Sequence, residues 1–389
     1  MDVTNAQIIA FRLAAQGLAG PPASDPLQLL EAWTVQDSPP GAATAALVNR
    51  LGRGDQAESE PGDHDAVPVG WLDDALASRA VVALYNARTA TAVVPAADAA
   101  IFATGMLPVE DADFKALVRT SVPEQRSGYA EPVELAVETI SEVLDGRALS
   151  RDDLHEELRQ RLPKALLPWC EPCGSHHAKR GLLVMASLRG RLCISGRAGR
   201  QPEFSRTDQW VDWGPPARAE AQRALLEQYL RAYGPSTPSD FAEWAGLSKP
   251  HARRIWGAAD DAGALTVVTV DGTGAGALLT TDAERLADPP AAEGVVMLGP
   301  GDPLLVGRDR ERLVPEAAVR KKLWSALPTT GLVLADGQPV ATWKANKRGK
   351  RLDVTVDRFA RGGRRSEIEA AAERLAAHRG VSGVAVTFA

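Results

Sequence analysis

Several features that would assign this 389-residue sequence to a specialised class of proteins are missing from it. There is no apolar run of about 18 residues, which argues against a membrane span, and the start of the chain lacks the pattern of a secretory signal. Three cysteines are too few for a disulfide framework. Hydrophobic residues at 45% and charged residues at 24% are ordinary globular values. We therefore expect a soluble, cytoplasmic protein of two or three domains, monomeric because no heptad repeat is present.

Charge is unevenly distributed along the chain, although the net charge is only −6. Residues 52–74 contain seven acidic side chains against Arg53 alone, and the Gly- and Pro-rich part, 52–68, is expected to be a mobile loop. Residues 343–365 contain nine basic and two acidic side chains. Such a basic stretch can bind the phosphates of a nucleic acid, although charge alone favours a solvated surface.

Apolar periodicity and capping residues predict a chain rich in helices, with short strands between them. Thr4 and Asp25 are expected to cap the first two helices, and a further helix is predicted over 42–51. The runs VVALYN and TAVVP predict a short hairpin. A helix, a helix capped by Ser150, a third helix and a short strand, RLCISG, then follow one another, and a similar order that ends in a hairpin occurs with Ser248 as a cap. Helix, capped helix, helix and hairpin is the order typical of a winged helix. We predict an α+β fold, mainly α, with winged-helix motifs in residues 1–120, 121–210 and 211–290 and a β-barrel or curled sheet in residues 291–389.

A polar segment separates the second predicted helix from a Pro-Pro-Gly break. In an extended chain Thr34 and Gln36 would share one face, with Val35 turned into the core. Asp37 follows directly. The alternative, which the residues alone favour, is that Thr34 and Asp37 are caps and that Gln36 is solvated.

A second candidate site consists of Cys170, Cys173, His176 and His177. Cys-x2-Cys is a zinc half-site, but the two histidines are adjacent, whereas a usual second half spaces them by three to five residues. One histidine could ligate, and Cys193 could complete the set. The alternative, which the spacing favours, is a turn packed against the following helix, so no metal site is predicted and a zinc-stabilised nucleic-acid module stays a minor hypothesis.

The third predicted winged helix contains a basic helix with His251, Arg253 and Arg254. A helix in this position can read a major groove, but in tandem winged-helix proteins it is often buried against a neighbouring element instead. The sequence leaves both possibilities open.

Seven stretches of the chain, in the same order, resemble the AlkZ-like and YcaQ-like winged-helix DNA glycosylases, with the AlkZ-like branch the closer. They are VQDSPPGAA, LYNARTATAVVPAADAAIF, LLPWCEPCGSHH, RGRLCISGRAGRQPEF, YLRAYGPSTPSDFAEWAGLS, GDPLLVGRDRERLVP and GQPVATWKANKRGKRLDV. The resemblance implies three winged helices and a β-barrel in a C-shaped body around double-stranded DNA. It also implies monofunctional excision of N7-alkylated purines, including bulky or crosslinked adducts. Such an enzyme would act at the nucleoid, in base-excision repair or in self-resistance to a DNA-alkylating natural product.

The catalytic signature of the family is Gln, an apolar residue, a second Gln and Asp, which align here with Thr34, Val35, Gln36 and Asp37. The resemblance implies that Gln36 holds the water that attacks C1′, with Thr34 as an accessory donor. Asp37 would orient Gln36, cap the next helix or stabilise cationic charge. No cofactor is expected, because N7 alkylation already makes the purine a good leaving group. Thr34 offers one donor where an amide offers two, which favours as an alternative a non-catalytic winged-helix protein that regulates or sequesters lesions.

DNA contacts are expected from three basic regions, and such contacts should depend on salt and carry little sequence preference. For Arg88 the alternative is a structural salt bridge. The candidates are Arg88, Arg308, Arg310, Arg312, Lys344, Lys347, Arg348, Lys350 and Arg351.

Overall fold

The computed structural model describes the chain except for residues 24, 52–66, 87, 89, 124–127, 199–200, 272–273, 326–328 and 361–363. Most of the predicted acidic loop, and Arg361 of the basic stretch, therefore lie outside the described residues. The chain forms two compact units. Unit 1 comprises Met1–Leu72, Tyr229–Ser236 and Ala264–Ala389, and unit 2 comprises Asp73–Gln228 and Thr237–Gly263.

Unit 1 begins with the helices that the capping residues predict. The Thr4 side chain accepts a hydrogen bond from the Gln7 amide in a reciprocal capping box, and Asp25 accepts one from Leu27. The elements are α1 (Asn5–Ala15), α2 (Pro26–Ala32), the short strand β2 (Val35–Gln36) and α3 (Ala42–Leu51). The predicted helix over 42–51 is confirmed residue for residue.

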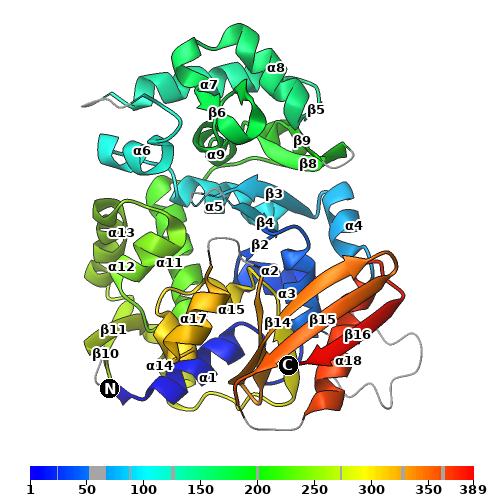
Figure 1. The fold of residues 1–389 in the computed structure, drawn as a ribbon. Coiled ribbons are helices and arrows are strands. Elements are labelled where there is room, and N and C mark those ends of the chain that lie inside the picture. Colours follow the sequence, from blue (N-terminus) through cyan, green and yellow to red (C-terminus); the bar gives the residue numbers. More distant parts are fainter. Residues whose placement is uncertain are drawn as a thin grey trace. The chain divides into compact units, whose positions relative to one another are not determined.

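The C-terminal part of unit 1 is an open five-stranded sheet in which the strands follow chain order (Figure 1). Its strands are β12 (Val295–Leu298), β13 (Gly331–Ala335), β14 (Gln338–Arg348), β15 (Arg351–Arg358) and β16 (Gly383–Phe388). The first four are antiparallel, whereas β16 pairs parallel to β15 after a crossover through α18 (Arg365–Ala377).

The predicted barrel is wrong, because the described strands do not close. Closure would require β12 to pair with β16, and these strands are the two edges of the sheet. Helix α18 contacts both β12 and β16, so it occupies the position from which the edges would have to meet. A hydrophobic core that includes Leu298, Leu332 and Leu334 lies under the sheet.

A smaller three-stranded sheet completes unit 1. β1 (Asp2–Val3) pairs parallel to β10 (Leu265–Val270), which forms the predicted hairpin with β11 (Gly274–Leu279). Helix α14 (Ala283–Ala287) connects this sheet to the larger one. Three further short helices lie between β12 and β13 of the larger sheet; they are α15 (Pro303–Val306), α16 (Arg310–Leu313) and α17 (Ala317–Leu323).

In unit 2 the predicted hairpin of VVALYN and TAVVP joins the strand predicted at RLCISG in one sheet, with the order β4-β3-β8-β9-β5. The strands are β3 (Val81–Tyr85), β4 (Thr91–Pro95), β5 (Leu149–Ser150), β8 (Cys193–Ala198) and β9 (Gln201–Ser205). Ala83 on β3 pairs with Ile194 on β8, which links the hairpins. Strand β9 was not predicted, because its sequence, QPEFS, is largely polar and contains a proline.

Helices make up the rest of unit 2, and the predicted helices that follow Ser150 and Ser248 are among them. The Ser150, Thr237 and Ser248 side chains each accept a hydrogen bond from a backbone amide of the first helical turn. The helices are α4 (Trp71–Ala77), α5 (Ala99–Gly105), α6 (Asp111–Val118), α7 (Ala130–Val143), α8 (Arg151–Arg161), α9 (Arg180–Leu188), α10 (Thr207–Trp210), α11 (Arg218–Tyr233), α12 (Pro238–Ala245) and α13 (Lys249–Asp261). Helix α4 begins in unit 1, and α11 ends there. Among the described residues, none of the helices has the length and apolar character needed to cross a membrane.

Candidate active site and nucleic-acid interface

The segment from Trp33 to Gln36 is extended, as the sequence predicts. Trp33 ends α2 and is 1% exposed, and Val35 is fully buried. Thr34 and Gln36 are half-buried on either side of Val35, so the alternation places both polar side chains on the face opposite to it. The local chain therefore presents a hydroxyl and an amide side by side.

Like the indole nitrogen of Trp33, the Gln36 amide has no hydrogen-bond acceptor among the described residues. Its Nε2 atom is buried, and no described residue accepts a hydrogen bond from it. A buried donor without a partner destabilises the folded state by about 1–3 kcal/mol, and a water or substrate bound to it would remove this cost.

Asp37 caps the next helix. Its Oδ1 atom accepts hydrogen bonds from the backbone amides of Gly41 at 2.7 Å and Ala43 at 3.2 Å, at the start of α3. This carboxylate also lies at the positive end of the helix dipole. Of the three predicted roles for Asp37, the structure shows the cap, and the other two stay predictions.

A loop from Gly299 to Asp302 packs closely against Ser38, the residue after Asp37. Gly301 has φ of +83°, and a Cβ atom there would lie 2.6 Å from the Ser38 carbonyl oxygen and 3.5 Å from Ala42 Cβ. Only glycine combines this backbone conformation with so close an approach. The contact fixes the chain where it passes from Asp37 to α3.

A buried ion pair anchors the same loop to α3. Nη1 and Nη2 of Arg50 donate to Oδ2 and Oδ1 of Asp302, each at 2.9 Å. Arg50 Nε also donates to the Gln16 carbonyl at 2.7 Å, and Nη1 donates to the Ala46 carbonyl at 2.8 Å. The guanidinium carbon is 4.7 Å from the centre of the Trp33 ring. One arginine thus connects α1, α3, the 299–302 loop and the residue before Thr34.

Sequence reasoning missed both partners of this pair, although one signal was present. Asp302 is followed by a proline and caps α15 by accepting from the Leu304 amide at 3.0 Å, which is a recognisable helix start. Arg50 carried no signal, because its neighbours in sequence do not show that it is fully buried.

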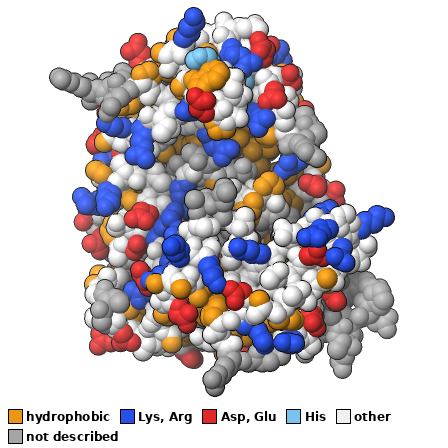
Figure 2. Space-filling model, viewed as in Figure 1, with side chains coloured by type: hydrophobic (Ala, Val, Ile, Leu, Met, Phe, Trp, Pro, Cys, Tyr) orange, Lys and Arg blue, Asp and Glu red, His pale blue; other side chains and the backbone are white. Residues whose placement is uncertain are grey.

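The predicted basic hairpin is strands β14 and β15 with the turn between them. Its five predicted DNA-contacting side chains are all exposed, and Figure 2 shows Lys and Arg side chains gathered over this hairpin. Trp343, at the base, is 3% exposed and donates through Nε1 to the Leu298 carbonyl at 2.9 Å, which holds the hairpin to the sheet. Arg348 and Arg351 both pair with Asp353, and the Lys347 Nζ atom donates to the Arg379 carbonyl. For Lys344 and Lys350 no ion-pair partner lies among the described residues.

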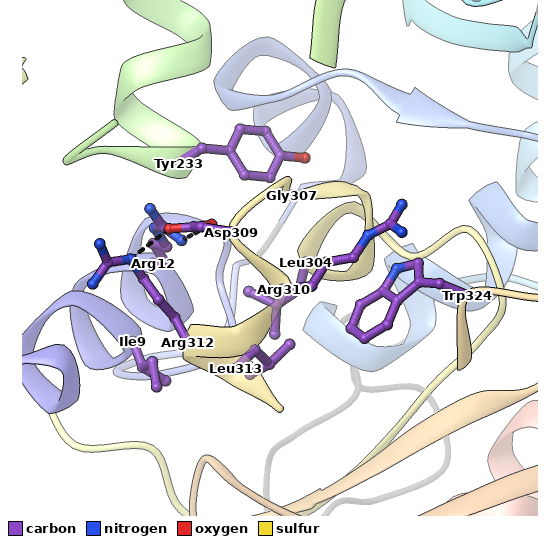
Figure 3. A pocket seen from close by; sticks show the side chains of 10 residues that line it. All are labelled: Ile9, Arg12, Tyr233, Leu304, Gly307, Asp309, Arg310, Arg312, Leu313 and Trp324. Carbon is purple, nitrogen blue, oxygen red and sulfur yellow. Dashed lines mark hydrogen bonds and ion pairs between the residues drawn. The ribbon is translucent and has the colours of Figure 1, made fainter. Parts of the chain in front are cut away.

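The arginines of the GRDRER stretch have different surroundings (Figure 3). Arg312 Nε donates to Asp309 at 2.7 Å, and the other oxygen of Asp309 accepts from Arg12 Nη1, also at 2.7 Å. Burial raises the pKa of Asp309, but the Arg12 and Arg312 charges outweigh it and hold this pKa below its ordinary value. Arg310 extends away from Asp309 and lies 4.9 Å from the centre of the Trp324 ring. All three arginines are half-buried, and Arg312, whose side chain is 19% exposed, is held in an internal ion-pair network.

Arg88 follows the β3 strand in unit 2. Its guanidinium lies 6.0 Å from the centre of the Trp244 ring, and its backbone amide donates to the Asn86 side chain at 3.0 Å. The described contact of the side chain is thus with an aromatic ring.

The basic helix α13 is packed against α6 and the residues before it. His251 is 1% exposed, Arg254 donates to Asp113 at 2.6 Å and pairs with Glu110, and the Ser248 hydroxyl donates to Asp113. Arg253 is exposed. Of the two possibilities that the sequence left open, the structure shows burial against a neighbouring element for His251, whereas Arg254 is exposed but forms ion pairs with Glu110 and Asp113.

The candidate metal residues are divided by the structure. Cys170, Cys173 and His177 come together, whereas His176 and Cys193 do not join them. Cys193 is buried in β8, and burial raises the pKa of its thiol to about 12.

The fold matches that of a solved DNA glycosylase. The structure of the Streptomyces sahachiroi DNA glycosylase AlkZ corresponds to this chain with a TM-score of 0.75, over 100% of both chains and at 22% identity. A curated relative, the interstrand DNA cross-link repair glycosylase of Streptomyces sahachiroi, is 32% identical over 224 residues. That match covers 54% of this chain and 57% of the relative, less than two thirds of its length.

The family model described as DNA glycosylase AlkZ-like matches residues 64–378. The chain belongs to this family, and the resemblance noted from the sequence is confirmed. The matched range begins after the segment from Thr34 to Asp37, so the family match does not extend to these residues.

Proposed function

We propose that this chain is a monofunctional DNA glycosylase that excises N7-alkylated purines, including bulky or crosslinked adducts, from double-stranded DNA. Membership of the AlkZ-like family and the shared fold support a DNA glycosylase. The observation that carries the proposal is Gln36, whose buried Nε2 atom has no acceptor among the described residues. A preorganised and unsatisfied amide is what positioning a water molecule requires.

A neutral site suits this substrate class. Alkylation at N7 gives the purine a positive charge, so the base leaves with the electron pair of its C1′ bond and becomes neutral without a general acid. The water oxygen bonds to C1′ of the oxocarbenium-like sugar and loses a proton to solvent. Gln36 would hold that water, and Thr34, on the same face of the segment, would add one hydroxyl contact.

DNA binding would rely mainly on the β14–β15 hairpin, where Lys344 and Lys350 are exposed. Arg88, Arg308 and Arg310 are additional candidates. Such contacts are made to phosphates and place the lesion without reading the base sequence.

The test is release of N7-methylguanine, and of a bulky N7-guanine adduct, from duplex DNA. Gln36→Ala should lose base release by about 10²-fold or more while DNA affinity is kept, because the amide acts at the reacting centre. Gln28→Ala is the matched control: Gln28 is an exposed glutamine on α2, eight residues before Gln36, and release should be unchanged. Thr34→Gln should raise the rate, since it restores a second amide.

Full excision by Gln36→Ala would contradict the assignment of the water to this residue. A wild type that binds the lesion tightly but yields no abasic product would instead support a non-catalytic, lesion-sequestering protein, which Thr34 at the first position of the family signature favours. Tight binding to one undamaged sequence would support a regulator.

A further inference from the structure

A compact turn in unit 2 brings Cys170, Cys173 and His177 together. Strand β6 (Trp169–Cys170) leads into a 3-10 turn (Glu171–Cys173), and the chain reverses at Gly174, which has φ of +59°, into β7 (Ser175–His176). Cys170 pairs with Ser175 across this small hairpin. The register returns the chain so that His177 lies beside both cysteines.

The geometry suits a metal ion. One ligand atom from each of the three side chains lies within 4.8 Å of the other two. In a tetrahedral zinc site, with Zn–S of about 2.3 Å and Zn–N of about 2.0 Å, ligand atoms are separated by roughly 3.5–3.8 Å. A contraction of about 1 Å, which side-chain rotation can supply, would form the site.

The imidazole of His177 is already oriented for ligation. Its Nδ1 atom is 2.9 Å from the Ala178 carbonyl oxygen, so Nδ1 carries the proton and donates to that oxygen. The Nε2 lone pair is thereby left available, and Nε2 is buried without a hydrogen-bond partner among the described residues. A backbone carbonyl that fixes the tautomer in this way is the usual outer contact of a metal-binding histidine.

The adjacent histidine cannot share the role, and this explains the unusual spacing. Side chains next to each other in an extended chain point in opposite directions. His176 accordingly lies with its ring 5.2 Å from that of Trp169, and its Nδ1 atom is 2.9 Å from the Leu167 carbonyl oxygen. The pair of histidines therefore supplies one ligand.

Two residues of the three-residue cluster line a cavity. Cys173 and His177 line a cavity of about 660 Å³, together with His155, whose ring centre is 4.5 Å from that of His177. Zinc sites with three protein ligands and an accessible fourth position hold water there. This arrangement differs from a closed four-ligand structural site.

We propose that Cys170, Cys173 and His177 bind one zinc ion, with water from the adjoining cavity as the fourth ligand. The site does not depend on the proposed glycosylase activity and lies in unit 2, whereas Thr34 and Gln36 belong to unit 1. Zinc would displace the two thiol protons and cross-link the turn between α8 and α9.

The test is the zinc content of the purified full-length protein by mass spectrometry, followed by titration of the metal-free protein with Co²⁺. We expect one zinc per chain and thiolate-to-cobalt charge-transfer absorption. Cys173→Ser and His177→Ala should weaken Co²⁺ binding by at least about tenfold. His176→Ala and Cys193→Ala are the matched controls, an adjacent histidine and a buried cysteine outside the cluster, and both should keep the zinc.

Two results would overturn the proposal. One is a wild-type protein that is purified without zinc and gives no charge-transfer band with Co²⁺, a result that does not depend on how any variant folds. The other is zinc that is retained in both Cys173→Ser and His177→Ala, with circular dichroism confirming that these variants are folded.

Discussion

Removal of the Asp302 carboxylate should destabilise unit 1 by about 3–5 kcal/mol. The Arg50 and Asp302 side chains are 0% and 1% exposed, and two hydrogen bonds of 2.9 Å join them. In Asp302→Ala the guanidinium would stay buried with a positive charge that only the Gln16 and Ala46 carbonyls still contact. The Leu304 amide would also lose its acceptor, which adds about 1 kcal/mol.

The free energy of unfolding from urea titration, followed by circular dichroism, measures this effect. In a unit of roughly 150–250 residues each kcal/mol lowers Tm by about 2–4 °C, so a fall of roughly 6–20 °C should accompany it. Asp353→Ala is the control, because its partners Arg348 and Arg351 are 75% and 59% exposed and such pairs contribute at most about 1 kcal/mol.

A double-mutant cycle measures the interaction energy between Arg50 and Asp302 apart from the other contacts of each residue. The cycle consists of Arg50→Met, Asp302→Leu and the double variant, which removes both charges and should therefore be more stable than Asp302→Leu alone. Two results would refute the view that this pair anchors the segment before α3. One is a loss of less than about 1 kcal/mol in the free energy of unfolding of Asp302→Ala. The other is a loss in the double variant that exceeds the sum of the losses in the two single variants.

Three further predictions concern the loop behind the motif, the basic hairpin and the packing of α13. Gly301→Ala should reduce base release, because the added Cβ would displace the Ser38 carbonyl. Gly294→Ala is the control: Gly294 also has positive φ, but a Cβ there would meet nothing within 4 Å, so the rate of excision should not change. Equal rates for the two variants would argue against a positioning role for Gly301. The double variant Lys344→Gln/Lys350→Gln should reduce the steepness of log K against log salt for DNA binding by about 2. The control, Lys344→Arg/Lys350→Arg, keeps both charges and should keep the slope. An unchanged slope in the glutamine variant would show that the hairpin does not contact DNA. Burial raises the pKa of Asp113, but hydrogen bonds from Ser248 and the Glu110 amide and the proximity of His251 hold it below its ordinary value. Stability from Asp113 is therefore present above the pKa of the unfolded carboxyl and is lost as the pH falls through the lower folded value, so Asp113→Asn should show less acid destabilisation than the wild type below about pH 4.

Local signals in the sequence were sufficient for most helices and for the face presented by the candidate site. Thr4, Asp25, Ser150 and Ser248 each accept a hydrogen bond from an amide two or three residues later, a range over which sequence is directly informative. The burial of Val35 between two half-buried polar residues follows from the alternation of an extended chain. The division into three winged helices stays a prediction.

Long-range pairing was beyond the sequence. Whether the C-terminal strands close into a barrel depends on what lies between the edge strands, and α18 contacts both of them. Strand β9 forms although its sequence does not predict a strand, because β8 and β5 flank it with free backbone groups.

The tertiary structure also decided which charged and metal-binding residues are available for binding. Arg312 and Arg254 belong to basic stretches, yet each is paired with an aspartate of its own unit. Arg312 pairs with the half-buried Asp309, and Arg254 pairs with the buried Asp113. His177 rather than His176 joins the cysteines because the register of a two-residue hairpin determines which side chain turns inward. By itself the sequence determined the helices, the family and the candidate motif; which side chains were already engaged depended on tertiary contacts such as that between Arg254 and Asp113, which no local pattern encodes.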